Sequence, residues 1–95
     1  VPAVHGAQVF YSEVEDSRKL AETVQSALNT VINDRNKEVK AAGGGVYLLK
    51  NAKIPAILVE CGFLSNGDET ALLNTQAHQN RLALTILASV LEHLQ

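Results

Sequence analysis

The longest apolar run of the chain covers residues 54–59 and is followed at once by Glu60 and, two positions later, by Gly62. A run this rich in β-branched residues is typical of a strand buried on both faces, although its periodicity alone also allows a short buried helix. We predict the central strand of a sheet here. The glycine then ends the strand in a turn.

Two longer stretches repeat their apolar residues with the period of a helix that covers a sheet. The first begins at Asp16 or Ser17, either of which is a typical N-cap, and ends near Asn33 and Asp34. Its predicted inner face consists of Leu20, Val24, Ala27, Leu28, Val31 and Ile32. Its predicted solvated face consists of Arg18, Lys19, Glu22, Gln25, Ser26 and Asn29.

The second helical stretch covers residues 76–94, and Thr75 is its predicted N-cap. Its predicted core face consists of Leu82, Ala83, Ile86, Leu87, Val90, Leu91 and Leu94. His78 lies near the start of this stretch and His93 near its end, and both are predicted to be surface residues.

Shorter elements connect these stretches. Residues 7–11 and 46–49 are predicted to be strands because of their aromatic and β-branched content. Gly43–Gly45 lacks the spacing and the following helix of a phosphate-binding loop, so a flexible turn is expected there. Asn66 with Glu69 three residues later is an N-cap pattern, which predicts a short helix after the turn at Gly62.

The order strand, helix, strand, strand, helix, helix predicts an α/β fold with helices packed on a mostly buried sheet. At 95 residues, 46% of them hydrophobic, the chain suffices for at most one small domain. No internal repeat or low-complexity linker divides it. The order of the strands in the sheet does not follow from this pattern.

Charge and composition exclude several classes of partner. The net charge is −2 and the charged residues are interspersed, so we expect no nucleic-acid partner and no polybasic membrane contact. No run reaches the roughly 18 apolar residues of a membrane span, and the N-terminus shows no signal segment. Cys61 is the only cysteine, which excludes an internal disulfide and a Cys-pair zinc site. We predict that it packs as a small hydrophobe.

Glu60 is the candidate for chemistry. A carboxylate at the end of a buried strand must lie where a partner or water reaches it. In open α/β sheets, ligands bind outside the carboxyl ends of the strands. The alternative is a glutamate that simply leaves the sheet into solvent, and the pattern alone leaves both interpretations open.

Residues 58–66, Leu-Val-Glu-Cys-Gly-Phe-Leu-Ser-Asn, resemble the Val-Glu-x-Gly-Phe-Leu-Ser-Asn signature of the zinc-dependent N-acetylmuramoyl-L-alanine amidases. The most similar members are the sporulation-type enzymes that act on spore cortex. Agreement extends to residues 6–11, to Asp34-Arg35 with Lys40 beyond, and to residues 46–50. The resemblance implies that residues 1–95 are the C-terminal half of a three-layer amidase catalytic domain.

The resemblance also implies a reaction and a site. The enzymes of this family hydrolyse the amide between N-acetylmuramic acid and L-alanine in bacterial peptidoglycan, and Glu60 takes the place of their general acid/base beside a zinc-activated water. Arg35 stands where they carry an arginine, which holds a carboxylate of a peptide stem or braces a loop; a solvated connector is the alternative. The family's zinc ligands, two His and one Glu, are expected upstream of this chain. His5, His78 and His93 are not expected to bind metal, so the chain alone is expected to be inactive.

Two other interpretations stay open at this point. The same scaffold also suits a non-catalytic module that binds cell-wall material or a protein partner, and a zinc peptidase has a similar layout. By resemblance the protein is expected in the cell wall, outside the cell or on the spore, with peptidoglycan as its partner. We also expect self-association through the surface that half a domain leaves uncovered.

Overall fold

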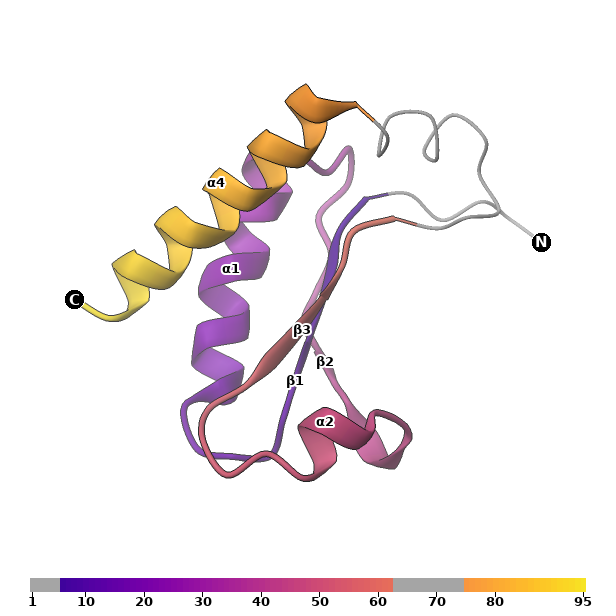
Figure 1. Cartoon of the computed structure of the whole chain (residues 1–95), viewed down its shortest axis with the longest axis vertical. Coiled ribbons are helices and arrows are strands. Elements are labelled where there is room, and N and C mark those ends of the chain that lie inside the picture. The colour runs from indigo at the N-terminus through magenta and orange to yellow at the C-terminus, as the bar shows by residue number, and fades with distance from the viewer. Residues whose placement is uncertain (1–5, 63–74) are drawn as a thin grey trace.

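The computed structural model describes residues 6–62 and 75–95 of the chain. Its elements, in chain order, are strand β1 (Gln8–Tyr11), helix α1 (Ser17–Val31), strand β2 (Lys40–Ala41), the 3-10 turn η1 (Gly43–Gly45), helix α2 (Tyr47–Lys50), strand β3 (Ile57–Glu60) and helix α4 (Gln76–His93) (Figure 1). None of these helices has the length and hydrophobicity needed to span a membrane.

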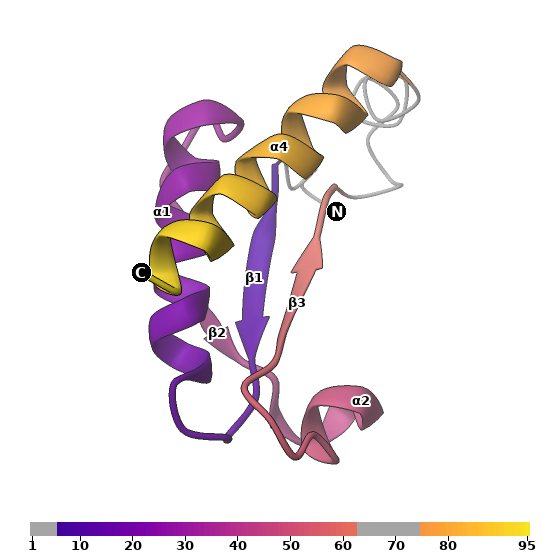
Figure 2. The same ribbon diagram turned by 60° about the vertical axis from the view of Figure 1, so that its left-hand side comes forward.

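The described strands form one sheet in the order β2-β1-β3. β1 runs parallel to β2 and antiparallel to β3, with Gln8 opposite Glu60 and Tyr11 opposite Ile57. The long helices α1 and α4 lie on the same side of the sheet (Figure 2). The core lies between these helices and β1 and consists of Ala7, Val9, Ala21, Val24, Leu28 and Leu82. The predicted α/β fold is therefore confirmed.

The position of β3 differs from the prediction of a central, doubly buried strand. Of the described strands, β1 is central and β3 is at an edge. Ile57 and Val59 pack against the core, whereas Leu58 is 36% exposed and Glu60 is also exposed. The reason is that the two long helices cover one face of the described sheet, so alternate residues of β3 point away from them.

The predicted strand over residues 46–49 is wrong. Val46 is the N-cap of helix α2, and the other three residues lie within that helix. Lys50 N–H donates to the Val46 carbonyl (2.9 Å) and Asn51 N–H to the Tyr47 carbonyl (3.0 Å). Only Leu49 of this helix is buried. The glycines before it form a 3-10 turn and not an irregular one. Aromatic and β-branched content is a weak preference, and here local hydrogen bonding overrides it.

Helix α1 begins at Ser17 and ends at Val31, as its periodicity predicts. Asp16 occupies the N-cap position, but its side chain makes no capping hydrogen bond. The predicted solvated face is wrong at Gln25, which is only 2% exposed. Ala21, which the predicted inner face omits, is fully buried. Val31, which the predicted inner face includes, is 42% exposed, so the buried stripe of α1 is displaced around the helix from the predicted face.

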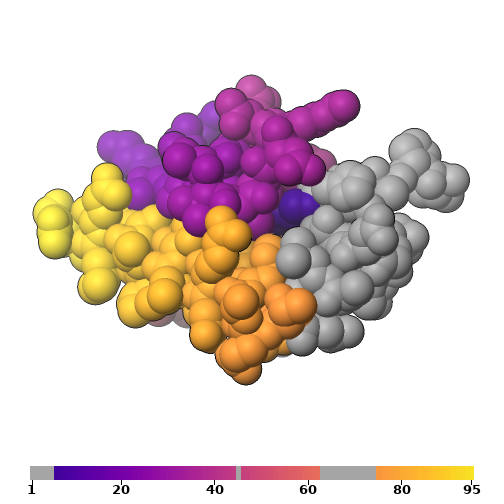
Figure 3. Space-filling view, turned by 90° about the horizontal axis from the view of Figure 1, so that it is seen from above, coloured from indigo at the N-terminus to yellow at the C-terminus, as the bar shows by residue number. Residues whose placement is uncertain are grey.

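Helix α4 is confirmed over Gln76–His93, and the Thr75 hydroxyl accepts the His78 N–H (3.2 Å) as its N-cap. Its predicted core face is only half correct. Leu82 is buried, and Ile86 and Val90 pack against the core. The remaining members of that face are exposed: Ala83, Leu87, Leu91 and Leu94. The helix packs beside α1 and leaves much of its own surface open (Figure 3).

The prediction that His78 and His93 are surface residues is wrong. His78, in the first turn of α4, is only 7% exposed. His93 lies at the other end of α4, with its Nε2 2.8 Å from Oδ2 of Asp16, the residue that precedes α1. This contact joins the last turn of α4 to the start of α1. The predictions for His5, Asn66 and Glu69 fall outside the described residues.

Gly6 gives a testable prediction, because its backbone is left-handed (φ +87°) and an added Cβ would collide with the Asn33 carboxamide. Gly6→Ala is therefore expected to destabilise the fold by about 1–3 kcal/mol in a urea melt. Gly44→Ala is the matched control, since nothing lies within 4 Å of its would-be Cβ. Equal midpoints for the two variants would contradict this role of Gly6.

Candidate active site

Glu60 is the last residue of β3 and lies directly opposite Gln8 of β1. The strand pairing holds its backbone, and Val59 just before it packs against the core. Its side chain is nevertheless exposed, and within the described part of the chain it forms no ion pair. The structure thus places a solvent-exposed carboxylate at the end of a paired strand.

Cys61 follows Glu60 and is the other reactive group type at this strand end. It is half-buried and packs against the core, which confirms its prediction as a small hydrophobe. Burial raises the pKa of the Cys61 thiol, because desolvation disfavours the thiolate. A thiol that stays protonated is a poor nucleophile. Of these two neighbouring side chains, Glu60 is the more exposed to solvent.

Three carboxamide side chains, which we call the carboxamide ladder, line one side of α1 and the residues just beyond it: Gln25, Asn29 and Asn33. Gln25 accepts the Val9 N–H at Oε1 (2.7 Å) and donates from Nε2 to the Ala7 carbonyl (3.0 Å). Asn33 likewise accepts the Ala7 N–H (2.7 Å) and donates to the Ala7 carbonyl (3.0 Å). A carboxamide carries the same donor and acceptor as a peptide group, so the ladder satisfies β1 as another strand would.

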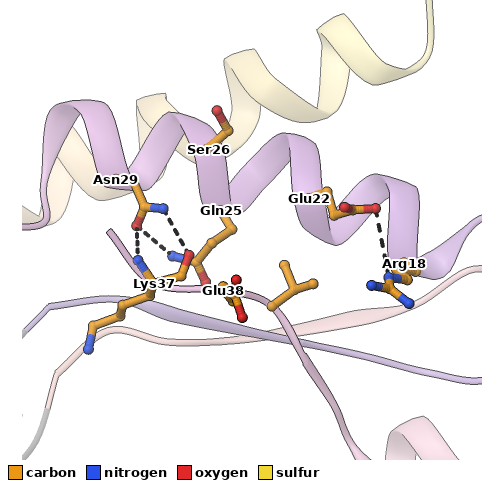
Figure 4. A pocket seen from close by; sticks show the side chains of 8 residues that line it. Arg18, Glu22, Gln25, Ser26, Asn29, Lys37 and Glu38 are labelled. Atoms are coloured by element: carbon orange, nitrogen blue, oxygen red, sulfur yellow. Dashed lines mark hydrogen bonds and ion pairs between the residues drawn. The ribbon is translucent and has the colours of Figure 1, made fainter. Parts of the chain in front are cut away.

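The middle carboxamide connects the ladder to the segment that leads into β2. Asn29 accepts the Lys37 N–H (3.1 Å) and donates to the Lys37 carbonyl (2.9 Å), as Figure 4 shows. Its Oδ1 also accepts hydrogen bonds from Gln25 Nε2 (3.1 Å) and Asn33 Nδ2 (2.7 Å). Sequence reasoning missed this ladder, although its spacing of four residues along a helix was the available signal.

Arg35 lies in the loop between Asn33 and Lys37 and is exposed. This loop is at the same end of the sheet as the carboxyl end of β3 (Figure 1). The hydrogen bonds agree, because Asn33 binds Ala7, the neighbour of the residue that pairs with Glu60. The structure therefore brings both predicted site residues to one end of the sheet, each facing solvent.

A cavity of about 320 Å³ lies beside the ladder, between α1 and the residues that precede β2 (Figure 4). Its lining is mostly polar and consists of Arg18, Glu22, Gln25, Ser26, Asn29, Lys37, Glu38 and Val39. Neither Glu60 nor Arg35 is among these residues. The cavity therefore does not itself define the site at the strand end.

Comparison with known proteins decides the family. The sequence model of the family described as N-acetylmuramoyl-L-alanine amidase matches residues 1–92, nearly the whole chain. The chain belongs to the N-acetylmuramoyl-L-alanine amidase family. The resemblance inferred from residues 58–66 is thereby confirmed.

Individual members of this amidase family are similar to the chain over most of its length. It is 33% identical to the germination-specific N-acetylmuramoyl-L-alanine amidase of Bacillus subtilis, over 93% of the chain and 37% of that protein. It matches the CwlD amidase of Clostridioides difficile, solved with the GerS lipoprotein, with 39% identity and a TM-score of 0.88. That match covers 96% of the chain and 47% of the structure.

A second solved structure, the N-acetylmuramoyl-L-alanine amidase of Clostridium difficile 630, is 30% identical with a TM-score of 0.87. The match covers 99% of the chain and 50% of that structure. The chain thus has the fold of amidase catalytic domains and spans about half the length of the solved amidases that it matches.

Metal ligation by this part of the amidase fold can be tested on the described residues. Residues 6–62 and 75–95 contain no group of three or more His, Cys, Asp or Glu side chains placed to hold a metal ion. His78 is buried at the start of α4, and His93 contacts Asp16 at its end. A catalytic zinc needs three protein ligands, so the described residues do not fit one.

Proposed function

We propose that residues 1–95 form the C-terminal part of a catalytic domain that hydrolyses the amide between N-acetylmuramic acid and L-alanine in peptidoglycan. Membership of the amidase family supports this proposal. The observation that carries it is the exposed Glu60 carboxylate at the end of β3, fixed by pairing with Gln8. In this proposal the remainder of the catalytic domain lies outside the chain.

Glu60 acts as the general acid/base. Its carboxylate takes a proton from the water that attacks the amide carbonyl carbon. When the carbon–nitrogen bond then breaks, Glu60 gives this proton to the departing amine of L-alanine. The products are the free lactyl carboxylate of muramic acid and a peptide stem with a free amino terminus. Proton transfer by a positioned carboxylate typically contributes about 100- to 10,000-fold in rate.

Arg35 binds substrate in this proposal. Arg35 is exposed, and its loop begins at Asn33, which binds Ala7 beside the residue that pairs with Glu60. A guanidinium presents a planar fork of donors that matches a carboxylate, and a peptide stem carries carboxylates. Arg35 therefore holds the stem while Glu60 serves the amide that joins the stem to the glycan.

Zinc enters the proposal only through the family resemblance. Because the described residues do not fit a zinc site, we propose that its ligands come from other residues of the whole protein. Bound there, zinc would supply Lewis acidity to the amide carbonyl and the attacking water. No role for His78 or His93 as a ligand is proposed.

The setting of the reaction follows from the same relatives. The B. subtilis relative is named as germination-specific, and both it and the family model are named for the amide of N-acetylmuramoyl-L-alanine. We therefore propose a cell-wall or spore-associated protein that acts on peptidoglycan, including that of the spore cortex.

The deciding experiment treats purified peptidoglycan with the full-length protein that carries this chain and identifies the products by mass spectrometry. We expect intact peptide stems that begin with a free L-alanine amine. Cleavage between residues of the stem would show a peptidase instead. Binding without release of stems would show a non-catalytic module.

Self-association of the 95-residue chain is a further expected property. Leu84, Leu87 and Leu91 of α4 and its C-cap Leu94 are all exposed, and such a stripe favours association. Leu91→Lys is expected to shift the mass measured by light scattering toward that of the monomer. Leu48→Lys, at an exposed leucine of α2, is the matched control. A wild-type chain that stays monomeric at high concentration would contradict this expectation.

A further inference from the structure

We propose that the carboxamide ladder positions Arg35 relative to Glu60, with Asn29 as the residue that sets the place of the Arg35 loop. The distance between the arginine fork and the acid/base then selects which carboxylate of the stem is held when the scissile amide reaches Glu60. This inference rests on the proposed function, since it gives a role to residues that support its two site groups.

The carboxamide ladder supports the strand end that carries Glu60. Glu60 is paired with Gln8, and the residues on both sides of Gln8 are held by the ladder. Gln25 binds the N–H of Val9, and both Gln25 and Asn33 bind the carbonyl of Ala7. Residues of β2 pair only with Phe10 and Tyr11, so the ladder replaces strand pairing at the Glu60 end of β1.

The carboxamide ladder also holds both ends of the loop that carries Arg35. The loop that carries Arg35 leaves the ladder at Asn33 and returns to it at Lys37, whose N–H and carbonyl are both bound by Asn29. Only Asp34, Arg35 and Asn36 lie between these two attachments. A span this short has little freedom once both ends are fixed. The loop and the strand end thus share one frame of side-chain amides.

Burial strengthens the hydrogen bonds of the ladder. Gln25 is almost fully buried and Asn29 and Asn33 are half-buried, so their hydrogen bonds are shielded from water. Removing one carboxamide leaves its partners without a bond, which shifts the attached backbone. The side-chain hydrogen bonds of Asn29 to backbone groups go to Lys37, and Asn29 also accepts from the side chains of Gln25 and Asn33. Without Asn29, these two carboxamides keep their own hydrogen bonds to Ala7 and Val9 of the β1 segment. Loss of Asn29 therefore displaces Arg35 while Glu60 keeps its place.

If Asn29 positions Arg35 and does not position Glu60, its loss should change KM and leave kcat nearly unchanged. In the full-length protein acting on peptidoglycan, Asn29→Ala is expected to raise KM about 10-fold, the cost of one weakened charged hydrogen bond. Its kcat is expected to stay within about 2-fold of wild type, because the reacting groups at Glu60 are unmoved. Asn29→Asp is expected to raise KM as well, since a carboxylate has no donor for the Lys37 carbonyl.

A double-mutant cycle with Arg35 separates positioning from general support of the fold. If Asn29 acts through Arg35, Asn29→Ala adds little to the KM of an Arg35→Ala protein. Asn51→Ala is the matched control, because among the described residues the side chain of this asparagine donates to the Tyr47 carbonyl of α2 and has no bond to the ladder. It is expected to leave KM unchanged in either background.

Hydrogen exchange in the 95-residue chain gives a readout that does not need activity. Asn29→Ala is expected to speed exchange at the Lys37 N–H and leave the Val9 N–H, which Gln25 holds, protected. Equal acceleration at both amides would overturn the proposal, as would additive effects of Asn29→Ala and Arg35→Ala on KM or a lower kcat with unchanged KM. If the full-length protein releases no stems with a free L-alanine amine, the proposed function itself fails, and if Glu60→Gln keeps full activity, Glu60 is not the acid/base. An active wild type with an inactive Glu60→Gln and an additive cycle defeats only the ladder's role.

Discussion

Glu60→Gln in the full-length protein is expected to lower the rate of peptidoglycan hydrolysis about 100- to 10,000-fold. The amide keeps the size of the side chain but cannot take a proton from water or return one to the leaving amine. Because Glu60 is exposed and β3 is held through its backbone pairing with β1, the fold should not change. The measurement is the release of stems with a free L-alanine amine, together with a melting curve of each variant.

Glu13→Gln is the matched control for this prediction. Glu13 is also exposed, but it follows β1 at the end of the sheet opposite to Glu60. It is expected to retain wild-type activity. If Glu60→Gln retained it too, the acid/base would have to be another group, and the half-buried Cys61 is a poor substitute because its pKa is raised.

The two long helices are the part of the fold that the sequence predicts best. Their period of 3.6 residues is a local property, and it places the ends of α1 and α4 within a residue or two. The face that packs is less well determined. In α4, apolar residues cover more than half of the circumference, so the pattern does not choose between Ile86 and Leu87; packing against α1 buries the first more than the second.

For polar residues the sequence pattern predicts exposure where the structure shows burial. Gln25 reads as solvated because carboxamides are usually exposed, yet it is buried against the backbone of β1. Its partners lie 16 and 18 residues away in sequence, so no local pattern reveals them. The four-residue spacing of the carboxamides in the ladder shows that they are neighbours along the helix. Their burial can be predicted only when the strand edge to which they hydrogen-bond is known.

The candidate site divides in the same way. The strand-end position of Glu60 is predictable, because an apolar run that ends in a carboxylate and a glycine is a local signal. The position of Glu60 relative to Arg35 in space cannot be predicted from the sequence. It depends on β3 running antiparallel to β1 and on Asn33 reaching Ala7, and both are tertiary facts that sequence spacing does not contain.

Leu28→Ala is expected to destabilise the chain by about 2.7–5 kcal/mol. Leu28 is fully buried in the core between α1, β1 and α4. Truncation removes apolar contacts and leaves a cavity that the surrounding helices and strand fill only in part. The measurement is a urea melt followed by far-ultraviolet circular dichroism, with the slope of the transition checked for two-state behaviour.

Leu87→Ala makes the same chemical change on α4 and is the matched control. Sequence periodicity places Leu87 in the core, but the structure leaves it 55% exposed. Its loss is therefore expected to cost less than about 1 kcal/mol, as for surface positions. The comparison should be made at a protein concentration at which the chain is monomeric, since self-association through α4 would bury Leu87. If both variants lost the same stability in the monomer, α4 would have to pack through the face that contains Leu87 rather than through Leu82.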